Sequence, residues 1–199
     1  MTLSESDFFA AVRGARAIAE AETQGLCSDP AFPSSFDDRS GAFVTVREYP
    51  SGTLRGCIGY MDADMPLRES LHAAARGVCR DPRFERLTFH EAERCTFEVT
   101  VLSPSEMVRY ESPEDLLSKI DLGEDGISMH ARIDGRRYSA VFLPQVPVEQ
   151  GWSKEEYLAN LCLKAGLYPD EWKRGRARFS RFRGTAYAET SPRGEVVKK

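Results

Sequence analysis

The residues of this chain that could do chemistry are concentrated in the hexapeptide Leu54-Arg55-Gly56-Cys57-Ile58-Gly59, which holds one thiol and one permanent cation. If the hexapeptide is a strand, Arg55, Cys57 and Gly59 share one face, and Arg55 and Cys57 lie about 6.6 Å apart along the chain. A nearby cation favours the thiolate, the form that attacks electrophiles and binds metals. We therefore expect a functional surface in which Cys57 is the nucleophile or a metal ligand. Arg55 would tune the thiol or hold an anion.

Gly56 and Gly59 leave bare backbone on either side of Cys57, where a ligand or a second chain segment could approach closely. A purely structural interpretation also stays open. A free cysteine in a strand is usually a small buried hydrophobe. Arg55 could then pair with a carboxylate such as Glu98 and join two strands, with Cys57 buried and inert.

Four further residues are candidates for the same site. Glu98 lies on the polar face of an expected strand and could act as general acid or base, or could be a solvated or salt-bridged carboxylate. Asp81 and Arg83 flank a proline at a helix end, so they could bind a ligand or only end the helix and pair with each other. Gln145 offers amide hydrogen bonds to a ligand or to its own loop. The cysteines include no C-x-x-C pair, which argues against a preformed structural zinc site, and the sequence assigns no set of metal-binding residues.

Hydrophobic periodicity and turn signals predict the elements that position these residues. A strand over 42–48 should form a hairpin with the hexapeptide strand, across the turn Pro50-Ser51-Gly52. A helix from Pro66 should end at Asp81-Pro82, because the residue before proline avoids the helical region. The other expected elements are a helix over 4–22, a strand over 95–103, a helix from 112, a hairpin of 127–133 and 137–143 around Asp134-Gly135, a helix from 153 to about 166, and a strand pair between 177 and 189.

Helices and strands alternate irregularly, which predicts an α+β fold with a largely antiparallel sheet flanked by helices. With 199 residues and 41% hydrophobic content, the chain can bury a core in one large domain or two intimate lobes. The charged residues 191–199 are expected to be a flexible tail.

Composition limits the partners and the compartment. No apolar run approaches the 18 or more residues of a membrane helix, and the first residues lack the features of a signal peptide, so we expect a cytoplasmic protein without a membrane partner. Five scattered cysteines argue against a disulfide framework. Lys and Arg crowd residues 173–183, with Trp172, Phe179 and Phe182 among them, as in single-strand binding. The net charge of −4 makes nucleic acid the less favoured partner, and an amphipathic strand with solvated arginines is the preferred interpretation.

Several short motifs occur around the hexapeptide in a specific order and spacing: 81–84 (DPRF), 99–104 (VTVLSP), 123–127 (GEDGI), 143–146 (LPQV), 151–152 (GW) and 162–167 (CLKAGL). Together they make the chain resemble the AMMECR family over about residues 6–189, and its archaeal members most. The resemblance implies a single AMMECR-type domain over 1–190. It also implies two unequal lobes with both termini in the larger one, and the hexapeptide near the cleft between the lobes.

Some microbial members of the family belong to a three-component group called AmmeMemoRadiSam, in which this chain would be the A component. The resemblance thus implies a Memo-like and a radical-SAM protein as partners, and it brings no activity and no cofactor. Two functions remain open. One is an enzyme or enzyme component that binds a small ligand, of unknown identity, at the hexapeptide, with Cys57 as thiolate. The other is a non-catalytic binding or scaffold module acting with one of those partners or with RNA.

Overall fold

The structure is a computed structural model that describes residues 3–61 and 65–199. The chain divides into two compact units. The first unit comprises Met1–Ser103 with Thr185–Lys199, and the second comprises Pro104–Gly184. Each unit has a hydrophobic core of its own, and each combines helices with antiparallel strands. The expected α+β class is confirmed.

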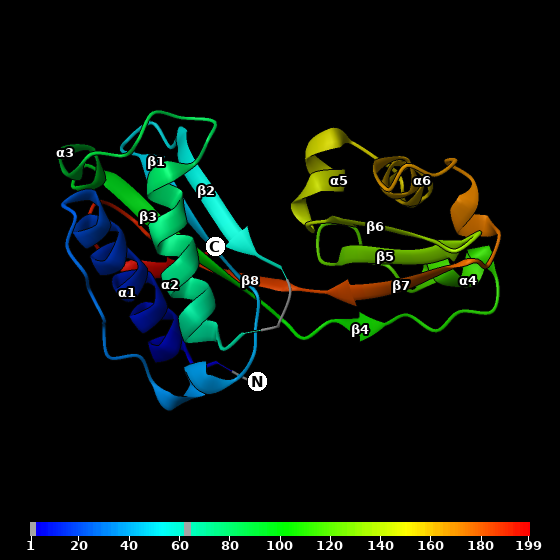
Figure 1. Cartoon of the computed structure of the whole chain (residues 1–199), viewed down its shortest axis with the longest axis horizontal. Helices are drawn as coiled ribbons and strands as arrows, with labels where there is room; N and C mark the ends of the chain where they lie inside the picture. The colour runs from blue at the N-terminus through cyan, green and yellow to red at the C-terminus, as the bar shows by residue number, and fades with distance from the viewer. Residues whose placement is uncertain (1–2, 62–64) are drawn as a thin grey trace. The chain divides into compact units, whose positions relative to one another are not determined.

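A five-stranded sheet in the order β2-β1-β3-β8-β9 is the centre of the first unit. Strand β1 pairs antiparallel with β2 on one side and with β3 on the other, which confirms the expected hairpin. Two helices lie side by side against one face of this sheet and bury its inward residues (Figure 1). The strands are β1 (Ala42–Glu48), β2 (Leu54–Tyr60), β3 (Cys95–Leu102), β8 (Gly184–Glu189) and β9 (Val196–Lys198).

The helices of the first unit begin and end where local signals place them. Helix α1 (Glu5–Thr23) starts with a capping box between Ser4 and Asp7, which satisfies two backbone donors of the first turn. Helix α2 (Leu67–Gly77) follows Pro66 and continues as a 3-10 turn to Asp81-Pro82, as the proline requires. The short elements are η1 (Ser34–Asp37), η2 (Val78–Arg80) and α3 (Phe89–Ala92).

The second unit is built on a four-stranded sheet in the order β4-β7-β5-β6. Asp134 and Gly135 both have positive φ, of 49° and 80°, and form the tight turn of the β5–β6 hairpin. Its strands are β4 (Glu106–Met107), β5 (Gly126–Ile133), β6 (Arg136–Phe142) and β7 (Ala177–Phe182). Its helices are α4 (Pro113–Ser118), α5 (Gln145–Gln150), α6 (Lys154–Lys164) and η3 (Glu171–Lys173).

Two expectations about the C-terminal part are corrected. The strands expected between 177 and 189 exist as β7 and β8 but are not a pair, because β7 belongs to the four-stranded sheet and β8 to the five-stranded sheet. The expected flexible tail after residue 190 is also wrong, since β9 pairs antiparallel with β8 and Val196 is buried. Burial of Val196 and the backbone hydrogen bonds of this strand explain why the segment is ordered.

Candidate functional site

Cys57 lies on β2, the edge strand of the first unit's sheet, and its thiol is half-buried. The hydroxyl of Thr45 on β1 donates a hydrogen bond to the sulfur, with 3.2 Å between Oγ1 and Sγ. Cys57 and Thr45 are directly opposite in the register. The backbone N–H of Cys57 points away from β1, so this is a non-hydrogen-bonded pair, the kind that brings side chains closest.

Asp81 and Arg83 hold the outer edge of β2 at Cys57. The buried carboxylate of Asp81 accepts the Cys57 N–H at 2.9 Å, and the Arg83 guanidinium donates to the Cys57 carbonyl at 3.1 Å. Arg83 also donates to both oxygens of Asp81, at 3.0 and 2.7 Å. The Arg83 guanidinium and the backbone of Cys57 hold the pKa of Asp81 well below its ordinary range. Asp81 and Arg83 therefore pair with each other, as one interpretation expected, and they also fix the backbone that carries the thiol.

Glu98 shares the sheet face of Cys57. It is opposite Thr45 in the β1–β3 register, so Cys57, Thr45 and Glu98 form one row across three neighbouring strands. Two strand spacings separate Glu98 from Cys57, about 9.5 Å, which is too far for a direct hydrogen bond. Glu98 faces Arg47 at 3.8 Å, so the salt-bridge interpretation of this residue is confirmed.

Arg55 does not share the environment of Cys57, and the expected alternation is wrong at this point. The β1–β2 register shifts between Val46 and Arg47, which leaves Arg55 as the extra residue of a bulge. Its guanidinium donates to Glu91 of α3, at 3.2 and 3.0 Å, and to the Glu85 carbonyl at 3.0 Å.

Arg55 also lines a hollow of about 270 Å³ with Glu48, Tyr49, Glu91, Arg94 and Cys95. Burial raises the pKa of Glu91, but hydrogen bonds from Thr88 and Arg55 outweigh it and hold that pKa below its ordinary value. Arg55 is therefore an already neutralised cation that ties β2 to α3. The cation beside Cys57 is Arg83.

At each of the two glycines of the hexapeptide, another side chain occupies the space that a Cβ atom would take. A Cβ at Gly59 would lie 2.2 Å from the ring of Phe43, its neighbour across the strands. At Gly56 it would lie 3.0 Å from Val78, in the turn after α2. Of the two interpretations of these glycines, the structure favours close approach by a second chain segment.

The other cysteines differ from Cys57 in burial. Cys79, Cys95 and Cys162 are buried, and burial raises the pKa of Cys79 and of Cys162 to about 11. Cys27 is exposed. Among residues 3–61 and 65–199, no three His, Cys, Asp or Glu side chains are grouped so that they could hold a metal ion.

Gln145 belongs to the second unit, where it is the first residue of α5 and is exposed. Cys57, Glu98, Asp81 and Arg83 therefore belong to the first unit, whereas Gln145 belongs to the second. None of the described helices combines the length and the apolar character needed to cross a membrane.

Thr45 is the member of the site that the sequence analysis missed. The signal was present, because Pro50-Ser51-Gly52 places β1 and β2 in one hairpin. Counting outward from that turn would place Thr45 near Cys57, but the bulge at Arg55 shifts the count by one residue.

The fold and the row of thiol, hydroxyl and carboxylate define an α+β protein of two units with a half-buried cysteine on an edge strand. The family model of AMMECR1 matches residues 12–187, and the chain belongs to this family. The expected membership is confirmed.

Relatives of known sequence are similar over most of their length. Protein MJ0810 of Methanocaldococcus jannaschii is 42% identical over 201 residues, which cover 100% of this chain and 97% of that protein. A protein of Thermofilum pendens is 40% identical over 176 residues, covering 84% of this chain and 81% of its own. The crystal structure of the uncharacterized protein PH0010 from Pyrococcus horikoshii matches with a TM-score of 0.82 and 37% identity, covering 99% of this chain and 98% of that one. The names of these relatives state no activity, so none passes from them to this chain.

Proposed function

We propose that this protein is an enzyme or enzyme component that binds a small electrophilic ligand at the sheet face around Cys57. The observation that carries the proposal is the Thr45 hydroxyl at 3.2 Å from a half-buried thiol. Cys57 is half-buried, so it is partly shielded from bulk water but remains reachable, and the Thr45 hydroxyl fixes the position of its sulfur.

The chemistry that suits this arrangement is nucleophilic addition to a carbonyl carbon. The sulfur lone pair forms the new S–C bond while the thiol proton leaves to water. The carbonyl electron pair moves to its oxygen, and the negative charge that develops there is stabilised by a nearby cation. Arg83 is the cation next to the Cys57 backbone. It is paired with Asp81 as Arg55 is with Glu91, but its side chain is 56% exposed against 10% for Arg55, so Arg83 is the one of the two that a ligand can reach.

Glu98 and Arg47 would define the far end of the ligand. They form an ion pair on the same face as Cys57, with Glu98 two strands away and Arg47 one strand away. A ligand that carries a hydroxyl, an amide or a charge at that end would find both a donor and an acceptor. The distance of about 9.5 Å across the row therefore favours a ligand of several heavy atoms over a single small carbonyl group.

The test is adduct formation on the native protein with a panel of small aldehydes, 2-oxo acids and thioesters, read by mass spectrometry of each cysteine peptide. We expect an adduct on Cys57 for at least one compound class and no comparable adduct on the exposed Cys27. Cys57→Ser should abolish the adduct with an unchanged circular dichroism spectrum, and Cys27→Ser is the matched control that should retain it.

The outcome that overturns the proposal is equal labelling of Cys57 and Cys27, or none at Cys57. The chain would then be a non-catalytic module, and pull-down with a Memo-like or a radical-SAM protein would be the experiment of choice. Cys57→Ser would leave such binding intact.

A further inference from the structure

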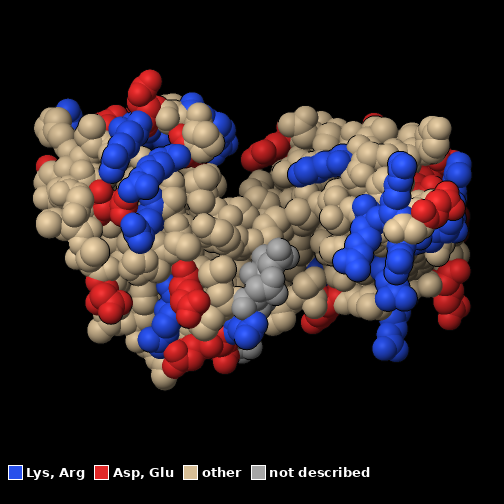
Figure 2. Space-filling model, in the orientation of Figure 1, with Lys and Arg blue, Asp and Glu red and all other residues tan. Residues whose placement is uncertain are grey.

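A second surface, independent of Cys57, stands on the sheet of the second unit. A hollow of about 670 Å³ lies over strands β5, β6 and β7, in the unit at the right of Figure 2, where Lys and Arg side chains gather. Its lining consists of His130, Ala131, Arg132, Arg137, Tyr138, Ser139, Arg176 and Arg178. No carboxylate belongs to this lining.

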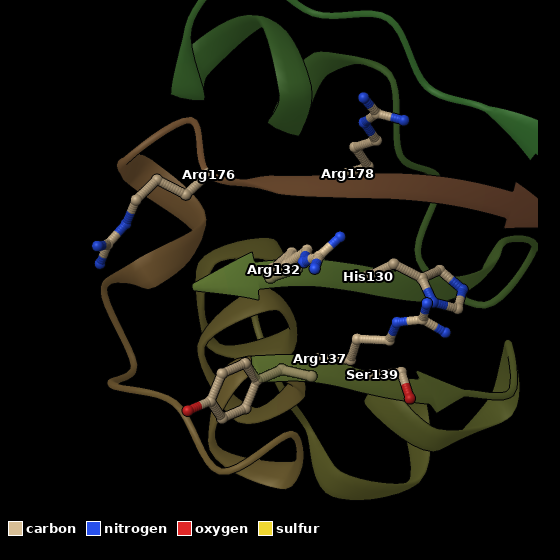
Figure 3. Close-up of a pocket in the computed structure, with 8 residues that line it drawn as sticks. His130, Arg132, Arg137, Ser139, Arg176 and Arg178 are labelled. Atoms are coloured by element: carbon tan, nitrogen blue, oxygen red, sulfur yellow. The ribbon is translucent and has the colours of Figure 1, made fainter. Parts of the chain in front are cut away.

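The strand register explains why these groups meet. Arg132 on β5 is directly opposite Arg137 on β6, and His130 is opposite both Ser139 and Arg178. All five of these residues are exposed. Figure 3 shows them projecting from three neighbouring strands, with the His130 ring and the Arg137 guanidinium pointing toward one another.

The arginines of this hollow differ from the other arginines nearby. Arg176 is directed away from the group (Figure 3) and pairs with Glu171 at 2.6 Å. In the part of the chain that the structure describes, Arg132, Arg137 and Arg178 have no carboxylate within 4.0 Å. Elsewhere in the second unit, Arg174, Arg181 and Arg183 pair with Asp170, Glu106 and Asp125.

This arrangement costs stability, which points to a ligand. Like charges directly opposite each other in a sheet, as at Arg132 and Arg137, are destabilising. The whole unit carries thirteen Lys and Arg against thirteen Asp and Glu, so a general excess of basic residues does not explain the patch. Positive charge has been segregated onto one sheet face.

We propose that this open sheet face binds the phosphate backbone of a single-stranded nucleic acid. Arginine forks match phosphate oxygens in pairs, and their spread over three strands suits a polymer with repeated charges better than one small anion. Open sheets are a common platform for single strands.

An acidic protein partner fits less well, because protein interfaces need apolar or aromatic anchors. The exposed large hydrophobic residues of this unit, Met107, Val148, Leu163 and Tyr168, lie outside the hollow, and Tyr138 in its lining is partly buried and packs against the core of the unit. The aromatic residues of the basic segment, Trp172, Phe179 and Phe182, are buried and do not offer stacking surfaces. Contacts would therefore go to the backbone, with little preference for base sequence.

The test is fluorescence anisotropy with a labelled 20-nucleotide oligouridylate and the full chain. Three neutralised phosphates predict a slope of log affinity against log salt of about −2, so affinity should fall about 20-fold between 50 and 200 mM salt. The triple variant Arg132→Gln, Arg137→Gln, Arg178→Gln should weaken binding by at least about tenfold at 50 mM salt and flatten the slope.

The matched control is Arg109→Gln, Arg174→Gln, Arg181→Gln, which changes the net charge equally but lies outside the hollow. It should bind nearly as the parent does. Thermal unfolding of both variants checks that the fold is retained, which positions at the surface should allow, since five of the six are exposed and Arg181 is half-buried. Equal binding by the two variants would overturn the proposal. Displacement of the probe by poly-L-glutamate as effectively as by unlabelled oligouridylate would also overturn it and would indicate an acidic peptide site. Equally effective displacement by uridine monophosphate would overturn it as well and would indicate a small-anion site.

Discussion

Removal of the Asp81 carboxylate should destabilise the first unit through the backbone of Cys57. In Asp81→Ala the part-buried Cys57 N–H loses its acceptor at 2.9 Å, and a donor left unpaired costs about 1–3 kcal/mol when it is shielded from water. The lost ion pair with Arg83 adds only about 0.2–1 kcal/mol, because the Arg83 side chain is 56% exposed. We therefore expect a total loss of about 1–4 kcal/mol in the free energy of unfolding, and Tm should fall by roughly 2–4 °C for each kcal/mol lost in a chain of this size.

The assay is urea unfolding at pH 7 with thermal unfolding beside it. Arg83→Gln is the control, since it removes the ion pair and the exposed hydrogen bond to the Cys57 carbonyl but leaves Asp81 bonded to the Cys57 N–H. Its cost should stay below about 1 kcal/mol. If Asp81→Ala proves no more destabilising than Arg83→Gln, the carboxylate does not anchor β2, and the reasoning is refuted.

Three further outcomes are expected. The folded-state pKa of Asp81 is low, so its carboxylate contributes stability that is present above its ordinary pKa and is lost as pH falls below that value. The difference in unfolding free energy between the parent and Asp81→Asn should therefore narrow from pH 7 to pH 3. A constant difference would contradict this. Glu189→Ala leaves Arg16 buried without its main partner and should lower the free energy of unfolding by about 3–5 kcal/mol, measured in urea. For comparison, Asp37→Ala at the more exposed Arg68–Asp37 pair should lower it by less than about 1 kcal/mol. Gly59→Ala places a Cβ 2.2 Å from Phe43 and 2.6 Å from the Ala42 carbonyl and should cost about 1–3 kcal/mol; an unchanged Tm would show that Phe43 moves aside freely.

Local chemistry made most elements predictable from the sequence. The capping boxes at Ser4 and Ser153 and the proline after Asp81 act on their own few residues, so the helix boundaries follow without knowledge of the fold. The two-residue turn at Asp134-Gly135 likewise sets the pairing of its hairpin. That same turn would have placed Arg132 opposite Arg137, a signal that the sequence analysis did not use.

Long-range pairing was not predictable in the same way. Strands β7 and β8 are adjacent in the chain but belong to different sheets. An alternating pattern indicates that a segment is a strand, but it does not indicate which strand pairs with it. No local sequence feature indicates the bulge at Arg55. Strict alternation predicted Arg55 and Cys57 on one face of the strand, and the bulge places them in different environments. The ion pairs of Arg55 with Glu91 and of Arg16 with Glu189 join residues 36 and 173 positions apart, and only the folded chain brings them together.

The measurement that tests the central claim most directly is alkylation of the native protein by iodoacetamide at pH 7, followed separately at each cysteine. The account predicts that half-buried Cys57 reacts faster than exposed Cys27, and that Cys79, Cys95 and Cys162 react only after unfolding. Thr45→Val, which removes the hydroxyl and keeps the shape, should slow Cys57 alone. If Cys57 reacts no faster than Cys27, or Thr45→Val leaves its rate unchanged, the thiol is not activated by its neighbours and the proposed site is contradicted.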